Sequence, residues 1–564
     1  MRPRRWGLLL LLGWLGQVAV RLWLSAGQSM PVATPDETGY LFAARVLTGG
    51  PGADMSFGTV YRGGYSLLLA PAFLVTDDPE AGYRIALAIN ALINAAMLPL
   101  AYVLLRRLEL TPRPAYVLAH VTALLPGVAF YSEFVLTDAV LPIVVIAWLL
   151  LAHNWLTASA SPARVTLYGT GVGVLAAFAY ASHTRGLMLM AVSGGLLLIS
   201  GVCRWRPWHM VAIAFTAMGA VATAGTVLNH RLLPHLYPNG DNDLGGNLVD
   251  RLTSVEGYGW FLSLGTGQVW YQIVATAGLA GIGLITVAAV AVRRGTAPHL
   301  RVLAACVLVL VFGIAFATSA ALPDEYRVGN YVYGRYLACV TPILFAVGAA
   351  VLLRASRRTA LLVAGSAAGL AVVTGGIVQL YAGDRLKRYT YTAYDFPDVS
   401  FLTWNWAEFR LWPATLAALV LLGLALLAAR LPRHPSAVLG GLLIAVHMAV
   451  LVTATTQISR PLVKNYSSYT DLSRTADPAE RPIVAMDWNV PWKLRMPQLY
   501  GLGRSETRTF DSSYQKPPAD AEVVILNWDG RKAPGKTWKN PPQGWYVSDS
   551  RSTPEGAWVA WVRD

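Results

Sequence analysis

Charged residues and cysteines are both scarce in this sequence. Asp, Glu, Lys and Arg together make up 13% of the 564 residues, whereas an ordinary soluble protein is about one quarter charged. Hydrophobic residues account for 55%, and they form repeated runs of roughly 20 residues, the length that spans a bilayer as a helix. This composition excludes a soluble enzyme and predicts a polytopic membrane protein.

The sequence also lacks the usual signatures of metal and nucleotide sites. Its cysteines, Cys203, Cys306 and Cys339, lie in or beside apolar runs, so they indicate neither a disulfide framework nor a CxxC metal motif. The histidines show no HxH or HExxH spacing, which argues against a transition-metal site. The run that starts at Gly265 is neither a P-loop nor a dinucleotide fingerprint, because no strand precedes it and no Gly-Lys-Ser/Thr follows.

Hydropathy predicts about 13 membrane-spanning helices. The first runs from the N-terminus to about Leu24, and we interpret it as an uncleaved helix because it is long for a signal peptide and lacks a clear cleavage site. The others are expected near residues 83–105, 115–130, 139–156, 165–181, 187–201, 211–228, 273–292, 302–321, 336–353, 361–381, 413–429 and 438–455.

The basic residues indicate how these helices are oriented. The net charge is +14, from 45 basic and 31 acidic residues, and basic residues collect in short cytoplasmic loops of membrane proteins. Alternating spans place the short arginine-rich loops, such as those of Arg106, Arg204, Arg293 and Arg354, on the side of the N-terminus. The frequent use of Ala, Gly and Arg is typical of a high-GC bacterium. We therefore expect a bacterial plasma-membrane protein with a cytoplasmic N-terminus, an outward C-terminal segment and no nucleic-acid partner.

The long polar segments fall on the expected outer face. They are residues 25–84, 229–272, 323–335, 384–410 and the tail from about residue 458. We predict a membrane domain at 1–457, whose first outer loop (25–84) contains interfacial helices, and an extracytoplasmic domain at 458–564. Short β-rich runs in the tail begin at Pro482, Ala521, Gly544 and Trp558, which favours a small α/β or mainly β domain.

Acidic residues mark two places near the outer end of the apolar runs. Asp36 and Glu37 begin a predicted interfacial helix, where acids favour the positive N-terminal turn. Asp138 stands at the outer entrance of an apolar helix, with Glu133 close before it. Carboxylates at membrane depth are costly and often functional, and helix capping is the alternative interpretation. A Mg²⁺ or Ca²⁺ ion held by Asp36, Glu37 or Asp138 is chemically allowed, and the sequence does not decide it.

Arginines on the expected outer face run against the positive-inside tendency. They are Arg62, Arg84, Arg185, Arg327 and Arg335. Guanidinium binds phosphate in a bidentate manner, so a lipid phosphate or pyrophosphate is the predicted partner. Contact with ordinary lipid headgroups, or pairing with the acids named above, remains the alternative.

Together these features resemble the GT-C superfamily of membrane glycosyltransferases. Asp36-Glu-Thr-Gly-Tyr40 is similar to the DExxY motif of the group that contains lipid A aminoarabinose transferases and protein O-mannosyltransferases. The segment from Glu133 to Asp138 matches the second acidic position of that group. Gly334-Arg-Tyr, followed by Pro342, resembles its RYxxPxxP stretch, although only the first proline spacing is loosely kept. The expected fold class is therefore mainly α, of GT-C type, with a small C-terminal α/β domain.

The resemblance implies an inverting glycosyltransferase. Such an enzyme moves a sugar from a polyprenyl-phosphate donor to an extracytoplasmic hydroxyl of a cell-wall glycan, a lipid or a glycoprotein. It implies that Asp36 is the catalytic base and that Glu37 and Asp138 assist or position the acceptor. The substrate- or phosphate-binding candidates are Arg62, Arg84, Arg185, Arg335, Tyr40, Tyr65 and Glu133.

Two other classes of protein share part of this pattern. A lipid or polysaccharide transporter would also have many spans, but it would be expected to show related halves, discontinuous helices and polar residues at mid-membrane. A non-enzymatic cell-wall assembly protein could use the tail to bind polymer. It would not need Asp36, Glu37 and Asp138 together at one interface.

Overall fold

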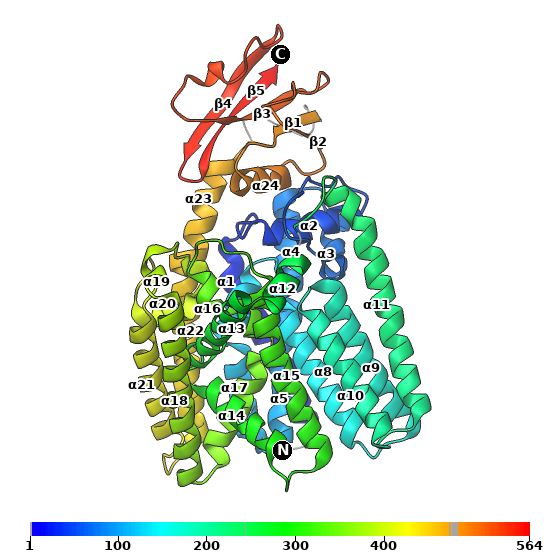
Figure 1. Cartoon of the computed structure of the whole chain (residues 1–564), viewed down its shortest axis with the longest axis vertical. Helices are drawn as coiled ribbons and strands as arrows, with labels where there is room; N and C mark the ends of the chain where they lie inside the picture. The colour runs from blue at the N-terminus through cyan, green and yellow to red at the C-terminus, as the bar shows by residue number, and fades with distance from the viewer. Residues whose placement is uncertain (1–2, 243, 473–474, 476–482) are drawn as a thin grey trace.

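Most of the chain folds into a helical bundle, and a small β-sheet domain stands at one end of it (Figure 1). The computed structural model describes residues 3–242, 244–472, 475 and 483–564. Within these residues, nine helices are long and apolar enough to cross a membrane, or up to twelve if each of three bent pairs is one span. The segment expected at 187–201 forms the shorter apolar helix α10 (Gly186–Val202).

The long spans begin and end close to the predicted positions. Several of them start at a proline, whose fixed φ and missing N–H suit the first helical turn. The long spans are α1 (Pro3–Leu24), α4 (Pro79–Asn94) with α5 (Met97–Arg107), α8 (Leu141–Thr157), α9 (Pro162–Ser182), α11 (Trp208–Leu236), α15 (Pro298–Ala321), α18 (Arg357–Ala382), α21 (Leu411–Ala428) and α22 (Pro435–Ala454).

Three spans are broken by sharp bends. The pairs are α6 (Pro112–Ala123) with α7 (Pro126–Ala129) and η2 (Phe130–Glu133), bent by 56°; α13 (Val255–Ala275) with α14 (Leu279–Val292), bent by 118°; and α16 (Gly329–Val332) and η4 (Arg335–Cys339) with α17 (Thr341–Arg354), bent by 75°. Pro126 cannot continue the hydrogen bonding of the preceding helix. Gly278 has a φ of +81°, which favours glycine, at the second break.

The segment 229–272 is mostly helical, so the prediction of a loop there is wrong. Helix α11 continues to Leu236, α12 (Leu244–Thr253) follows, and α13 already begins at Val255. Glycines and polar residues lower the hydropathy of α13, yet they serve its packing. A Cβ on Gly267 would lie 1.8 Å from the carbonyl oxygen of Tyr331, so only glycine lets α13 approach α16 so closely.

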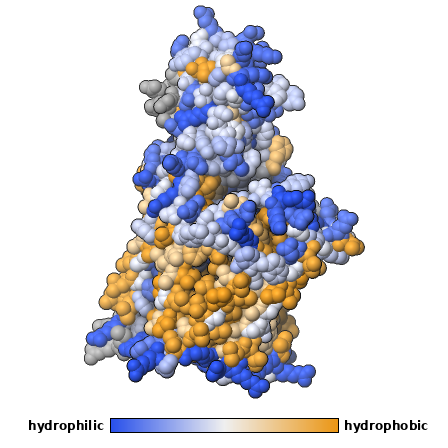
Figure 2. Space-filling model, turned by 90° about the vertical axis from the view of Figure 1, so that its left-hand side faces the viewer, coloured by the Kyte–Doolittle hydropathy of each residue, from blue (hydrophilic) through white to orange (hydrophobic). Residues whose placement is uncertain are grey.

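The surface of the bundle has the polarity expected for a bilayer. In Figure 2 a broad band of hydrophobic side chains covers the bundle, with hydrophilic side chains along its lower rim and above it. Exposed apolar side chains on several spans contribute to this surface, such as Leu11, Leu362, Leu416 and Leu427. The predicted membrane domain is thus built as a bundle with a lipid-compatible exterior.

Short helices connect the spans on the side of the sheet domain, and they carry five of the ten candidate site residues. They are η1 (Ser25–Gly27), α2 (Asp36–Leu47), α3 (Gly63–Val75), η3 (Thr137–Ala139), α19 (Arg385–Arg388), η5 (Ala393–Asp395) and α20 (Pro397–Thr403). Helix α2 packs against α3, α11 and α24. A helix is therefore present after Pro35, but nine of its 12 residues are buried, so its placement at the interface stays a prediction.

The C-terminal segment forms a five-stranded sheet with the order β2-β1-β3-β5-β4. The strands are β1 (Ile483–Asp487), β2 (Glu506–Phe510), β3 (Val523–Trp528), β4 (Trp545–Thr553) and β5 (Gly556–Arg563). Strands β1, β2 and β3 pair in parallel, and β3, β5 and β4 pair antiparallel. Strand β2 was not predicted, because four of its five residues are polar. Pro482, where the first strand was expected to begin, lies outside the described residues.

A continuous helix leads from the bundle to the sheet. Helix α22 continues through the π-helical turn η6 (Thr455–Ser459) into α23 (Arg460–Thr470). The boundary expected at 457/458 falls inside this helix. Helix α24 (Trp492–Gly501) connects β1 to β2 and packs on α2 and α4, so the sheet domain contacts the bundle at a second place. The sheet domain also contains the short helix η7 (Pro534–Lys536).

Candidate active site

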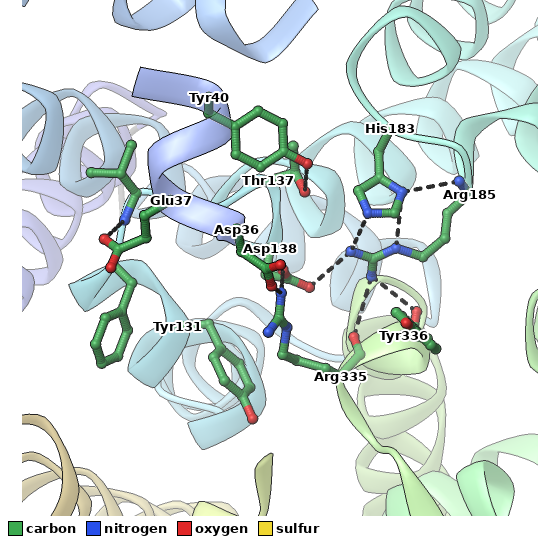
Figure 3. Close-up of polar contacts among 12 residues, drawn as sticks. Asp36, Glu37, Tyr40, Tyr131, Thr137, Asp138, His183, Arg185, Arg335 and Tyr336 are labelled. Atoms are coloured by element: carbon green, nitrogen blue, oxygen red, sulfur yellow. Dashed lines mark hydrogen bonds and ion pairs between the residues drawn. The ribbon is translucent and has the colours of Figure 1, made fainter. Parts of the chain in front are cut away.

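Two acids and two arginines from distant parts of the chain meet beside α2 (Figure 3). Asp36 belongs to the first turn of α2, Asp138 to η3, and Arg335 to η4, while Arg185 directly precedes α10. Nη2 of Arg335 lies 2.6 Å from Oδ2 of Asp36 and 3.3 Å from Oδ2 of Asp138. Nη2 of Arg185 lies 3.0 Å from Oδ1 of Asp138. One arginine therefore bridges the two carboxylates predicted to be catalytic.

The two carboxylates differ sharply in their access to solvent. The side chain of Asp36 is 31% exposed, whereas that of Asp138 is 1% exposed. The side chains of Arg185 and Arg335 are buried as well, at 2% and 9%. A buried ion pair is favourable only when its groups are well paired, and Asp138 satisfies this with two guanidinium groups. Of these four side chains, Asp36 is the one that an incoming molecule can reach most easily.

Tyr61 holds the carboxylate of Asp36 from the opposite side. Its hydroxyl donates a hydrogen bond of 2.7 Å to Oδ1 of Asp36. Burial and the charge of Asp36 raise the pKa of Tyr61 well above its ordinary value, so the phenol stays protonated and remains a donor. One oxygen of Asp36 thus accepts from Tyr61 and the other pairs with Arg335. Because Asp36 lies in the first turn of α2, the partial positive charge of the helix dipole also stabilises its carboxylate.

Aromatic rings enclose the guanidinium of Arg335. Its Cζ lies 5.5 Å from the ring centre of Tyr131 and 5.9 Å from those of Tyr333 and Tyr394. Such rings stabilise a cation while excluding water. Nε of Arg335 is buried and has no hydrogen-bond partner in the described part of the chain. This N–H is therefore available to an anionic ligand.

Arg185 fixes the backbone that carries Arg335. It donates to the carbonyl oxygens of Arg335 and Tyr336 at 3.3 and 3.2 Å. The Nδ1 atom of His183 accepts from the backbone N–H of Arg185 at 3.1 Å. Burial and the neighbouring charge of Arg185 lower the pKa of His183 well below its ordinary value, so the imidazole is neutral.

Glu37 has a structural position in spite of its place beside Asp36. Its Oε2 accepts from the backbone N–H groups of Val32 and Ala33 at 2.8 and 2.7 Å, and its Oε1 accepts from Tyr83 Oη and the Val135 N–H at 2.5 and 2.8 Å. The residue is fully buried, and this burial raises the pKa of Glu37 against the lowering effect of those bonds. The geometry does not place Glu37 among the reacting groups, because all its bonding capacity is used to tie the loop before α2 to the segment before Asp138.

The other predicted residues lie in different places. Arg62 donates to the carbonyl oxygen of Tyr180 at 2.7 Å and stacks on its ring at 4.4 Å. Tyr40 contacts Thr137 Oγ1 at 3.3 Å, beside Asp138, whereas the buried Tyr65 donates to Asn90 at 2.7 Å. These contacts make Tyr40 part of the wall of the site and Tyr65 part of the core.

Arg84 and Glu133 do not join the cluster. Arg84 is 61% exposed and pairs with Glu80 one turn away on α4. Glu133 accepts from the hydroxyls of Thr455 at 2.6 Å and Ser459 at 3.0 Å, which ties η2 to the π-helical turn η6. The interpretation of both as substrate-binding residues lacks support, because one pairs at the surface and the other stabilises two packed elements.

A cavity borders the cluster on the side of Arg335. It is a small cavity of about 20 Å³, partly open to solvent, and its lining includes Tyr131, Tyr271, Arg335 and Asp398. It meets a second small cavity, also of about 20 Å³, at four shared residues, Pro126, Ala275, Thr276 and Asp398. The wall of the second cavity is mostly aliphatic and includes Leu402, Leu421, Leu442, Leu443, Val446 and Val450.

Sequence reasoning missed Tyr61, Tyr131, Tyr333, Tyr394 and Asp398. The chain contains 25 tyrosines, and none of these four stands in a pattern that separates a site residue from a core residue. Asp398 lies in a polar outer segment, where an acid is expected anyway. Their roles emerge only when segments more than 250 residues apart pack together, as Tyr131 and Tyr394 do.

No three His, Cys, Asp or Glu side chains are grouped to hold a metal ion in the described ranges. The guanidinium of Arg335, and not a third acid, faces both Asp36 and Asp138. The donor set therefore does not fit a metal site built by the protein alone, and no step is derived through a metal.

Fold and site together define a polytopic helical membrane protein with a charged cluster under a small sheet domain. No family model matches the sequence, and no curated protein matches it. The structure is similar to ArnT from Cupriavidus metallidurans, both bound to undecaprenyl phosphate and in the apo state, with a TM-score of 0.55 and 16% identity over 99% of this chain and 98% of that chain. A likeness to the apo oligosaccharyltransferase of Archaeoglobus fulgidus has a TM-score of 0.36 and 10% identity over 91% of this chain and 69% of that chain, too low to carry an argument. The chain thus has the ArnT fold, and the predicted fold class is confirmed.

Proposed function

We propose that this chain is an inverting glycosyltransferase that moves a sugar from a polyprenyl phosphate to an acceptor hydroxyl outside the membrane. The observation that carries the proposal is the bridge of Arg335 between an accessible and a buried carboxylate. The similar fold of ArnT, which was solved with undecaprenyl phosphate, supports the class of donor.

In this proposal Asp36 is the general base. It takes the proton from the acceptor hydroxyl as the oxygen attacks the anomeric carbon, and the bond from that carbon to the phosphate oxygen breaks. Tyr61 and Arg335 orient its two oxygens. Because the acceptor displaces the phosphate directly, no covalent intermediate forms and the anomeric configuration inverts.

Arg335 stabilises the negative charge that develops on the leaving polyprenyl phosphate. Its unpartnered Nε–H and its aromatic surroundings provide a low-dielectric place where such an interaction is strong. Asp138 pairs with this guanidinium and keeps it in position, and Arg185 in turn pairs with Asp138. The aliphatic residues around the second cavity are compatible in polarity with the isoprenoid part of such a donor, which needs more room than this small cavity provides.

A transporter or a cell-wall assembly protein is the alternative. In a transporter the polar site is expected near mid-membrane between related halves. Here the charged cluster lies beside α2, at the end of the bundle that meets the sheet domain (Figure 1). This position favours chemistry at the outer interface over transport through the bundle.

The direct test is a transfer assay with purified protein. Polyprenyl phosphates that carry a labelled pentose or hexose would be combined with a panel of glycan, lipid and peptide acceptors. We expect transfer from at least one donor, with the product linkage inverted relative to the donor by NMR. Absence of transfer from every donor, together with translocation of the labelled lipid in vesicles, would contradict the proposal and favour the transporter.

A further inference from the structure

The sheet domain contacts α2 directly at the end of the helix opposite Asp36. Arg45, in the last turn of α2, is buried, and its Nη1 and Nη2 donate to the carbonyl oxygens of Gly503 and Tyr500. Tyr500 belongs to the last turn of α24 and Gly503 follows the end of this helix, where carbonyl groups have fewer partners than in a helix interior. Arg45 therefore caps α24 with a positive charge, which also interacts favourably with the helix dipole.

The same contact continues through aromatic rings. Cζ of Arg45 lies 5.3 Å from the ring centre of Tyr500 and 5.2 Å from that of Phe42. Burial lowers the pKa of Arg45 to about 10, so the guanidinium is still ionised at neutral pH. A buried charge that lost these carbonyl partners would be left uncompensated, which is strongly unfavourable.

Tyr500 also reaches toward the other end of α2. Its hydroxyl donates to the carbonyl oxygen of Pro79 at 2.8 Å, and its ring lies 6.3 Å from that of Tyr83. Tyr83 in turn donates to Glu37, the neighbour of Asp36. The sheet domain therefore acts on both ends of α2, directly through Arg45 and indirectly through Tyr83 and Glu37.

A surface ion pair between the same two parts of the protein provides a contrast. Arg504 and Asp77 are 2.6 Å apart, and their side chains are 52% and 67% exposed. Exposed pairs of this kind contribute little to stability. The buried contacts of Arg45 and Tyr500 are therefore the ones that can fix the position of α2.

We propose that Arg45 and Tyr500 are positioning residues, through which the sheet domain fixes the position of α2, and so of Asp36, relative to Arg335. The inference rests on the proposed function, because this position matters only if Asp36 and Arg335 take part in the transfer reaction. A misplacement of about 1 Å far from the chemistry can lower a rate about 100-fold. The sheet domain is then a required part of the catalytic unit.

The test compares Arg45→Met and Tyr500→Phe with Arg504→Met in the transfer assay. We expect kcat to fall roughly 10- to 100-fold in Arg45→Met and by a smaller factor in Tyr500→Phe, which loses only the hydrogen bond to Pro79, while the donor KM changes less than about twofold in both. Amide hydrogen exchange of residues 36–47 should become faster in both. Arg504→Met should leave kcat, KM and exchange unchanged. Tyr500→Phe keeps the ring and removes only the hydroxyl, so it remains informative if Arg45→Met does not fold.

A double-mutant cycle with Asp36→Asn distinguishes positioning from a general structural role. If Arg45 acts through Asp36, then Arg45→Met should lower the residual rate of Asp36→Asn by less than about twofold. An equal loss in both backgrounds, or unchanged kcat in folded Arg45→Met and Tyr500→Phe, would overturn the inference and leave the proposed function intact. Absence of transfer by the wild type would instead overturn the proposed function, and the inference with it.

Discussion

Asp36 and Asp138 both pair with Arg335, but their surroundings indicate different roles. Asp138 is buried between Arg185 and Arg335, whereas Asp36 is partly exposed and bound on its outer side by Tyr61. A carboxylate that must accept a proton from an incoming molecule has to be accessible. A carboxylate that only holds arginines in place does not need access.

The stability of the two Asp→Asn variants should reflect this difference. Asp138→Asn leaves the buried Arg185 without a carboxylate partner and Arg335 with Asp36 alone, which costs about 3–5 kcal/mol. Asp36→Asn removes a partly exposed pair and should change stability by no more than about 1 kcal/mol. Thermal unfolding midpoints in one detergent would measure both. Equal midpoints for the two variants would contradict the division between a buried anchor and an accessible base.

Asp398 gives a pH-dependent signature of a buried acid. Burial raises the pKa of Asp398 to about 7, against the hydrogen bond that it accepts from Tyr271. The folded chain then holds this proton more tightly than the unfolded chain, so stability falls as the pH rises from the ordinary Asp value to about 7.

Asp398→Asn removes that dependence, so its stability relative to wild type should increase as the pH is raised from 5 to 8. Unfolding midpoints across this range would check it, with the exposed Asp384→Asn as control. A constant difference between Asp398→Asn and wild type at every pH would disprove the assignment.

The sequence singled out the four charged residues of the cluster and missed most of the tyrosines around it and the nearby Asp398. Asp36, Asp138, Arg185 and Arg335 are unusual where they occur, because charge is costly next to an apolar run. Tyr61 carries no such cost, so nothing in the sequence separates it from a core tyrosine.

The same limit applies to the partners of a predicted residue. Glu37 is as unusual in the sequence as Asp36, but only the structure shows that its oxygens are already occupied by four donors. Arg84 was unusual by sidedness alone, and its ordinary pairing with Glu80 depends on the position of α4.

At the scale of elements, hydropathy located the apolar helices well and missed elements that are rich in glycine or polar residues. Helix α13 was partly missed because its glycines and glutamines lower its hydropathy, although they let it pack tightly. Strand β2 was missed because it has polar residues on an edge of the sheet. Both elements owe their structure to neighbours that the local sequence does not reveal.

The close approach of α13 to α16 predicts a strong effect of one methyl group. In Gly267→Ala the new Cβ would clash with the carbonyl of Tyr331, near the start of the segment that carries Arg335. We expect a loss of about 1–3 kcal/mol in stability and a lower transfer rate. Gly259→Ala on the same helix meets only an ordinary contact at 3.7 Å, so it should be neutral or slightly stabilising. Similar unfolding midpoints for the two variants would contradict the packing argument.

At the scale of the whole molecule, the cluster and the sheet domain are expected to face outward. The short arginine-rich loops are predicted on the side of the N-terminus, and the sheet domain stands at the opposite end from the N-terminus (Figure 1). Cys203 is exposed in the turn between α10 and α11, and Tyr514 in the sheet domain is 89% exposed.

Cysteine labelling in whole cells tests this orientation. Tyr514→Cys, placed in a Cys203→Ser background, should react with a membrane-impermeant maleimide in intact cells. In the unaltered chain, Cys203 should react only after the membrane is permeabilised, and the buried Cys306 and Cys339 serve as internal controls. The reverse pattern would place the sheet domain in the cytoplasm and rule out an outward-facing reaction.

The central claim is that Asp36 removes the acceptor proton in a transfer from a polyprenyl-phosphate sugar. The most direct measurement is the single-turnover rate of Asp36→Asn beside wild type, with donor binding measured on the same preparations. We expect donor binding to be retained and the rate to fall at least about 100-fold, since a general base contributes about 10²–10⁴-fold. A folded, donor-binding Asp36→Asn that transfers sugar at the wild-type rate would contradict the account.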